Sequence, residues 1–122
     1  MIARMTSVLL IDDDPAFREL ARRVLSGNGL EVVGEADSVA TGMAAALGLR
    51  PDAMLVDVGL PDGDGVDLAR ELAALPWRPR VVLTSIDPDA ASAEDVRRTG
   101  VGGFAPKAEL PGRGLRLLLA PA

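Results

Sequence analysis

The stretch VLLIDDDPAF, residues 8–17, joins an apolar run to three consecutive aspartates and a proline. The apolar part is typical of a buried strand, and we expect that strand at about 7–11. Asp14 followed by Pro15 is typical of a helix start, because aspartate caps free N–H groups and proline fits the first helical position. The stretch therefore predicts a strand that leads directly into a helix ending before Gly27. The three carboxylates that lie between the strand and the helix repel one another, which raises the question of what neutralises their charge.

The rest of the chain repeats this strand-then-helix pattern. Further strands are expected at about 31–34, 53–56, 80–83 and 103–105. Helices are expected from a Ser38 cap to Gly48, over 66–75, from the Asp87-Pro88 pair to Gly100, and over 110–119. This alternation predicts one domain over residues 1–122, an α/β doubly wound (βα)5 sandwich with a five-stranded parallel sheet covered by helices on both faces.

Composition excludes several classes of function. The 122 residues contain no cysteine and no histidine, so a disulfide framework, a thiolate metal site and a histidine base are all absent from the sequence. No apolar run reaches the roughly 18 residues of a membrane span, and we expect a cytoplasmic protein with no membrane contact. The net charge of −5, with dispersed arginines, predicts no direct binding of nucleic acid by this domain.

Polar side chains stand where the predicted strands end, which is the edge where open parallel sheets bind ligands. They are the acidic triplet from Asp12, then Asp57, Thr84 and Lys107, the only lysine beside twelve arginines. Converging carboxylates suit Mg²⁺, which prefers hard oxygen ligands. One carboxylate can then attack a phosphoryl group, while a hydroxyl and an ammonium hold the phosphoryl oxygens.

Four segments in this order, LIDDDPAF, MLVDVGLPDGDG, VVLTS and GFAPK, resemble the receiver domain of two-component response regulators. The similarity covers about residues 7–119, and the phrasing of GLPDGDG and GFAPKAEL is closest to the NarL/FixJ-type subfamily. The resemblance implies a flavodoxin-like sheet of strand order 2-1-3-4-5. It also implies a phosphorylation-activated signalling switch, rather than an enzyme, that takes its phosphoryl group from a sensor histidine kinase or phosphotransfer protein.

The resemblance assigns a role to each acidic residue. It makes Asp57 the phosphoacceptor and a direct Mg²⁺ ligand together with Asp13 and the backbone carbonyl of Gly59. Asp12 would bind Mg²⁺ through a water molecule. Asp14 suits a helix cap better than a ligand.

The resemblance also assigns the responding residues. Thr84 would bond a phosphoryl oxygen, and Lys107 would pair with the phosphoryl group. Phe104 would swing inward as Thr84 moves, with an ordinary core aromatic as the alternative. The conformational change on phosphorylation would reach a face built from the fourth helix, the fifth strand and the fifth helix. The domain could form a homodimer through this face. Alternatively, a DNA-binding domain absent from this chain would carry the output.

Two alternative functions compete with this one. A haloacid-dehalogenase-like phosphatase would use Asp12 as nucleophile, but Pro15-Ala16 stands where that family has glycine and threonine or valine, and Asp57 would have no role. A degenerate receiver would act only as a binding module, although all the strand-end residues are present.

Gly59 and Ile86 offer no polar side chain to orient an attacking water, so we expect an acyl phosphate that lasts minutes or longer.

The acidic loop GLPDGDG lacks the glutamate and the ligand spacing of a calcium loop. We therefore expect a turn and a helix cap there. The segment concerned is Asp62-Gly63-Asp64-Gly65.

Overall fold

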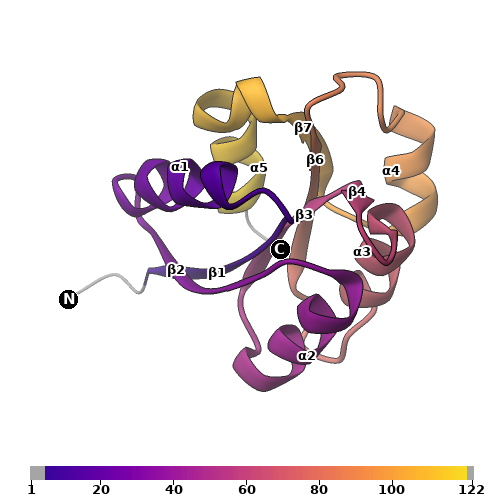
Figure 1. Cartoon of the computed structure of the whole chain (residues 1–122), viewed down its shortest axis with the longest axis horizontal. Helices are drawn as coiled ribbons and strands as arrows, with labels where there is room; N and C mark the ends of the chain where they lie inside the picture. Colours follow the sequence, from indigo (N-terminus) through magenta and orange to yellow (C-terminus); the bar gives the residue numbers. More distant parts are fainter. Residues whose placement is uncertain (1–4, 121–122) are drawn as a thin grey trace.

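The chain forms a five-stranded parallel sheet with helices on both faces, as the computed structural model of residues 5–120 shows (Figure 1). The elements are β1 (Thr6–Ile11), α1 (Pro15–Ser26), β2 (Leu30–Ala36), α2 (Val39–Leu49), β3 (Ala53–Asp57), β4 (Gly59–Leu60), β5 (Gly63–Asp64), α3 (Gly65–Ala73), β6 (Arg80–Ser85), α4 (Ala93–Thr99), β7 (Gly103–Pro106) and α5 (Leu115–Leu119). The sheet order is β2-β1-β3-β6-β7, which is the predicted order 2-1-3-4-5 for the five main strands. The two-residue strands β4 and β5 form a separate antiparallel pair inside the loop after β3.

Side-chain alternation along β1 explains why both faces of the sheet are covered. Val8 and Leu10 pack into the core on one face, with residues of α1 and α5. Leu9 and Ile11 pack into the core on the other face, with residues of α2 and α3. All four side chains are at most 1% exposed, as expected for a strand of a doubly covered parallel sheet.

The helix starts follow local capping chemistry. Asp14 caps α1 by accepting a hydrogen bond from the Ala16 N–H at 3.0 Å, as predicted. The predicted start of the fourth helix at Asp87-Pro88 is wrong, because these residues form a turn and α4 begins at Ala93. Ser92 caps α4 in a capping box with Asp95, which satisfies two backbone N–H groups that Asp87 does not reach.

Several other boundaries differ from the prediction by one or two residues; α3, for example, ends at Ala73 rather than at 75. α2 runs through Gly48 and ends at Leu49, because Arg50 takes up the left-handed conformation that terminates it, with φ of 47°. The predicted helix over 110–119 is helical throughout but not uniform: a π turn at Leu110–Gly114 precedes α5. Pro111 supplies no N–H to this turn, and a Cβ on Gly114 would lie only 2.9 Å from Leu110 Cδ1.

Candidate functional site

Parallel pairing brings the strand-end residues to one edge of the sheet. Asp12 follows β1 and Asp57 ends β3, and these two strands are neighbours. Asp57 is in register with Thr84 of β6, and Thr84 is in register with Ala105 of β7, two residues before Lys107. The structure therefore places together the residues that the sequence analysis selected from four separate segments.

Three carboxylates form the centre of this edge. Oxygen atoms of Asp12, Asp13 and Asp57 all lie within 4.8 Å of one another. Asp12 and Asp57 are buried, whereas Asp13 is exposed. Asp12 Oδ1 accepts the N–H of Asp14 at 2.8 Å, and Asp57 Oδ1 accepts the N–H of Gly59 at 3.2 Å. The second oxygen of each buried carboxylate, Oδ2, lies within 4 Å of the Lys107 ammonium.

Lys107 supplies a positive charge between the two buried carboxylates. Its Nζ lies 2.8 Å from Asp12 Oδ2 and 3.6 Å from Asp57 Oδ2, and its side chain is only 11% exposed. The Lys107 Nζ also lies 4.4 Å from the centre of the Phe17 ring, which is a favourable position for a cation over an aromatic face. The ammonium group is thus held beside the carboxylates rather than in bulk solvent.

One lysine does not neutralise three carboxylates. Burial raises the pKa of Asp57, and the Asp12 and Asp13 charges raise it further, against the opposing effects of the Gly59 N–H and of Lys107. Asp12 Oδ2 is fully buried, and its contact with Lys107 lacks hydrogen-bond geometry, so among the described residues it accepts no hydrogen bond. A hard divalent cation fits this set, because carboxylate oxygens are the ligands that Mg²⁺ prefers and its charge would offset the excess negative charge.

The loop after Asp57 approaches the site so closely that it requires a glycine. The Gly65 N–H donates to the Val58 carbonyl at 2.8 Å, and Val58 N–H donates to the Thr84 carbonyl at 2.9 Å. A Cβ on Gly65 would lie 1.9 Å from the Asp57 carbonyl oxygen. Gly65 therefore allows the start of α3 to pack directly against the backbone of Asp57.

The acidic loop before Gly65 caps the helix that follows it, as predicted, and also the start of α2, which was not predicted. Asp64 caps α3 by accepting the Val66 N–H at 2.8 Å. Asp62 accepts the N–H groups of Val39 at 2.7 Å and Ala40 at 3.1 Å, at the start of α2. These bonds lower the pKa of Asp62. Both carboxylates are thus engaged by backbone rather than arranged around a calcium ion.

Two α1 residues that the sequence analysis did not select as site residues also contact the site. Phe17 lies under Lys107, as described above, and Arg18 Nη1 donates to the backbone carbonyl of Asp12 at 2.6 Å. Their only sequence signal is their position in the first turn of the helix that follows the acidic triplet.

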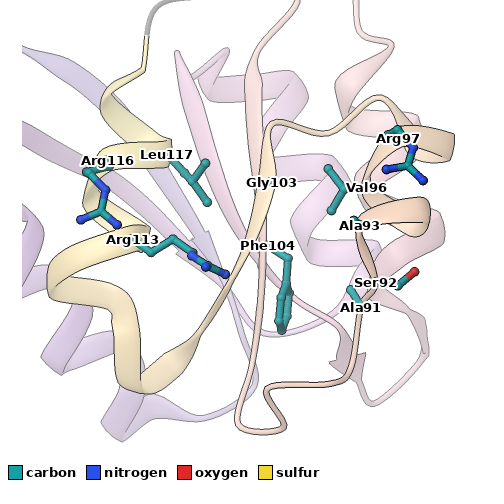
Figure 2. Close-up of a pocket in the computed structure, with 10 residues that line it drawn as sticks. All are labelled: Ala91, Ser92, Ala93, Val96, Arg97, Gly103, Phe104, Arg113, Arg116 and Leu117. Carbon is teal, nitrogen blue, oxygen red and sulfur yellow. The ribbon is translucent and has the colours of Figure 1, made fainter.

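The predicted switch residues are both buried on strands near the cluster: Thr84 on β6 is in register with Asp57, and Phe104 lies on the neighbouring strand β7. Thr84 is 1% exposed, and Phe104 is 8% exposed on β7. Figure 2 shows the Phe104 ring directed into the space between β7 and α4, at one side of a groove of about 590 Å³ between α4, β7 and α5. The groove lining combines apolar side chains with one serine and three arginines. The residues that line the groove are Ala91, Ser92, Ala93, Val96, Arg97, Gly103, Phe104, Arg113, Arg116 and Leu117.

Within residues 5–120, no helix is long and apolar enough to cross a membrane.

Comparison with known proteins gives one consistent result. The family model for the response regulator receiver domain matches residues 8–117. The chain is 38% identical over 105 residues to the DNA-binding transcriptional activator DevR/DosR of Mycobacterium tuberculosis, covering 84% of this chain and 48% of that protein. It is 38% identical over 81 residues to the KDP operon transcriptional regulatory protein KdpE of Escherichia coli, covering 66% of this chain and 36% of that protein. The chain thus spans about half or less of these relatives' length.

Solved structures support the same fold. The signal receiver domain of the response regulator NarL from Mycobacterium tuberculosis superposes with a TM-score of 0.83 at 29% identity, covering 96% of this chain and 95% of that one. A LuxR-family response regulator from Aurantimonas has a TM-score of 0.81 at 24% identity, covering 92% and 81% of the two chains, and shares the fold.

Proposed function

We propose, on the premise that the chain belongs to the family of response regulator receiver domains, that Asp57 is its phosphoryl acceptor. Receiver domains are the phosphoacceptor switches of two-component systems, and they interact with histidine kinases. The observation that carries the assignment is the position of Asp57: a buried carboxylate with a raised pKa, at the end of the central strand, between Lys107 and two further aspartates. The phosphatase alternative with Asp12 as nucleophile receives no support from the family match.

The transfer uses simple chemistry. A carboxylate oxygen of Asp57 attacks the phosphorus of a phosphohistidine on the kinase or on a phosphotransfer protein. The phosphorus–nitrogen bond breaks, its electron pair stays with the imidazole of the donor, and an acyl phosphate forms on Asp57. The attacking carboxylate must be ionised, so the site must overcome the burial that raises its pKa.

Mg²⁺ and Lys107 would offset the effect of burial on Asp57, because positive charge near the carboxylate favours its ionised form. Receiver domains bind Mg²⁺ at an acidic pocket, and Asp13, Asp57 and the Gly59 carbonyl would hold it here, with Asp12 acting through water. When bound, the ion would neutralise charge on the transferring phosphoryl group. Lys107 is already within 3.6 Å of the Asp57 carboxylate and would pair with the phosphoryl oxygens that form there.

The response to phosphorylation begins at Thr84. Its hydroxyl would bond a phosphoryl oxygen, since its backbone is in register with Asp57 on the neighbouring strand. The movement would vacate space toward which Phe104 turns, and the groove between α4, β7 and α5 would change shape (Figure 2). The output is then read at this face, by a second copy of the domain or through a DNA-binding domain outside this chain.

The lifetime of the phosphorylated state follows from two neighbours. Gly59 has no side chain, and Ile86 is 80% exposed and apolar, so neither orients a water for attack on the acyl phosphate. Self-dephosphorylation is therefore slow, with a half-life of minutes or longer.

We place the protein in the cytoplasm and expect no direct contact of this domain with nucleic acid, given its net charge of −5.

The test is phosphorylation by a small-molecule donor, acetyl phosphate, with and without Mg²⁺, followed by intact-protein mass. The wild type should gain one phosphoryl group only with Mg²⁺, and Asp57→Ala should gain none. A gain that persists in Asp57→Ala would show that another residue is the acceptor. Sedimentation of the phosphorylated protein then tests whether a second copy occupies the groove face.

A further inference from the structure

We infer that Arg18 is a positioning residue for the acidic cluster, because it fixes the peptide unit that joins Asp12 to Asp13. This inference rests on the proposed Mg²⁺-dependent phosphorylation of Asp57, and it assigns to α1 a part in holding the aspartates in place. Within residues 5–120, the hydrogen bonds of Arg18 go to Glu35 and to the Asp12 backbone, not to an aspartate side chain of the cluster. Arg18 acts through the backbone.

The Asp12 backbone is held on both sides. Its N–H donates to the Ala36 carbonyl at the end of β2, at 2.9 Å. Its carbonyl oxygen accepts from Arg18 Nη1 at 2.6 Å. That carbonyl belongs to the peptide plane between Asp12 and Asp13, so the arginine restrains the orientation of both residues. Hydrogen bonds from a charged donor are stronger than those between neutral groups, which makes this restraint effective.

Glu35 holds the arginine in turn. Arg18 Nε donates to Glu35 Oε1 at 2.9 Å, and the Arg18 side chain is 19% exposed. Because the guanidinium is planar and rigid, its Nε–H can donate to Glu35 on β2 while its Nη1–H donates to the Asp12 carbonyl. Arg18 thus bridges the ends of β1 and β2 beside the site.

Arg22 provides a matched control within the same ion-pair cluster. It also binds Glu35, with Nη2 at 2.7 Å and Nε at 2.9 Å from Oε2. It lies one turn farther along α1, its side chain is 45% exposed, and its only other hydrogen bond among the described residues is to the Val32 carbonyl at 3.4 Å. Arg22 therefore shares the charge and the glutamate partner of Arg18 but, within residues 5–120, makes no hydrogen bond to Asp12.

Electrostatics and positioning predict opposite signs. Removing a positive charge near three carboxylates should strengthen Mg²⁺ binding if charge alone matters. Removing a group that orients the ligands should weaken it, and residues that support metal ligands typically change affinity about 10-fold to 100-fold. The direction of the change in Mg²⁺ affinity therefore separates the two explanations.

The experiment measures Mg²⁺ binding to the unphosphorylated protein by isothermal titration calorimetry. We compare wild type, Arg18→Ala, Arg18→Lys and Arg22→Ala, with urea denaturation in EDTA to establish that each variant is folded. Arg18→Ala should bind Mg²⁺ about tenfold more weakly or worse. Arg18→Lys keeps the charge but cannot bridge Glu35 and Asp12 together, and it should also bind more weakly than wild type. Arg22→Ala should bind within about twofold of wild type, because its surface ion pair contributes little.

Three results would overturn the inference: unchanged or tighter binding by Arg18→Ala, equal weakening by Arg18→Ala and Arg22→Ala, or full wild-type affinity in Arg18→Lys. These differ from a failure of the proposed function. If the wild type itself binds no Mg²⁺, the metal-dependent function is wrong, and the role of Arg18 falls with it.

Discussion

Replacing Gly65 by alanine should destabilise the domain and displace the phosphoacceptor. The added Cβ would lie 1.9 Å from the Asp57 carbonyl oxygen and 2.8 Å from both Asp57 C and Val58 Cα. All three atoms belong to backbone, so no side-chain rotation relieves the clash. Reaching even the 3.0 Å limit of real Cβ contacts requires the two segments to separate by about 1.1 Å. That movement also stretches the 2.8 Å hydrogen bond from Gly65 N–H to the Val58 carbonyl.

The expected loss in the free energy of unfolding is about 1 to 3 kcal/mol. Overpacking a well-packed region typically costs about 1 to 3 kcal/mol, and a weakened buried hydrogen bond adds about 1 kcal/mol. The better helix propensity of alanine returns about 1 kcal/mol at most. For a domain of this size the melting temperature should fall by up to about 10 °C. Because Asp57 moves with its carbonyl, the rate of phosphorylation by acetyl phosphate should fall as well.

Urea denaturation followed by circular dichroism measures the loss, and Gly59→Ala is the matched control. Gly59 lies in the same loop, but a Cβ there would meet no atom within 4 Å, so its variant should stay within about 0.5 kcal/mol of wild type. If Gly65→Ala loses less than about 1 kcal/mol and phosphorylates at the wild-type rate, the close approach described above does not constrain the site.

The Arg22 and Arg18 side chains lower the pKa of Glu35. The stability from these pairs should therefore be present above the ordinary carboxyl pKa and be lost as pH falls through the lowered pKa. On acidification in urea titrations, Glu35→Gln should lose less stability than the wild type, by well under about 1 kcal/mol for so exposed a cluster. Asp62→Ala should destabilise the domain by about 1 kcal/mol through loss of the two N–H bonds at the start of α2, whereas Asp62→Asn, whose single amide oxygen replaces only one of the two acceptor atoms, should recover only part of this loss in urea denaturation. Ile86→Gln should shorten the acyl-phosphate half-life in Mg²⁺, measured by intact mass over time, because an amide can orient water; an unchanged half-life would show that residue 86 has no such role.

The fold was largely predictable because its determinants are local. β-Strand runs, the Asp14 cap and the stop at Gly27 can all be identified within short windows, and the structure confirms them. The start of α4 was predicted wrongly, because Asp87-Pro88 resembles a helix start locally, whereas Ser92 is the residue that caps the helix. The choice depends on the reciprocal bonds between Ser92 and Asp95, which a preference for proline at the helix start does not reveal.

The convergence of the strand-end residues at one edge of the sheet was predictable for a topological reason. Parallel strands present their carboxyl ends at one edge, so residues far apart in sequence converge there without any knowledge of distances. The supporting contacts are different. Asp62 caps a helix that starts 23 residues earlier, and Arg18 binds a backbone carbonyl through a side chain whose direction depends on Glu35 of another strand. Such contacts depend on tertiary packing, and no periodicity or spacing in the sequence indicates them.

The residue that carries the acyl phosphate can be located chemically. Borohydride reduces an aspartyl phosphate to homoserine, and peptide mass mapping then identifies the converted residue. After phosphorylation by acetyl phosphate in Mg²⁺, we predict homoserine at position 57 and unmodified Asp12 and Asp13. Homoserine at position 12 or 13, with Asp57 intact, would contradict the assignment and would favour a nucleophile in the acidic triplet.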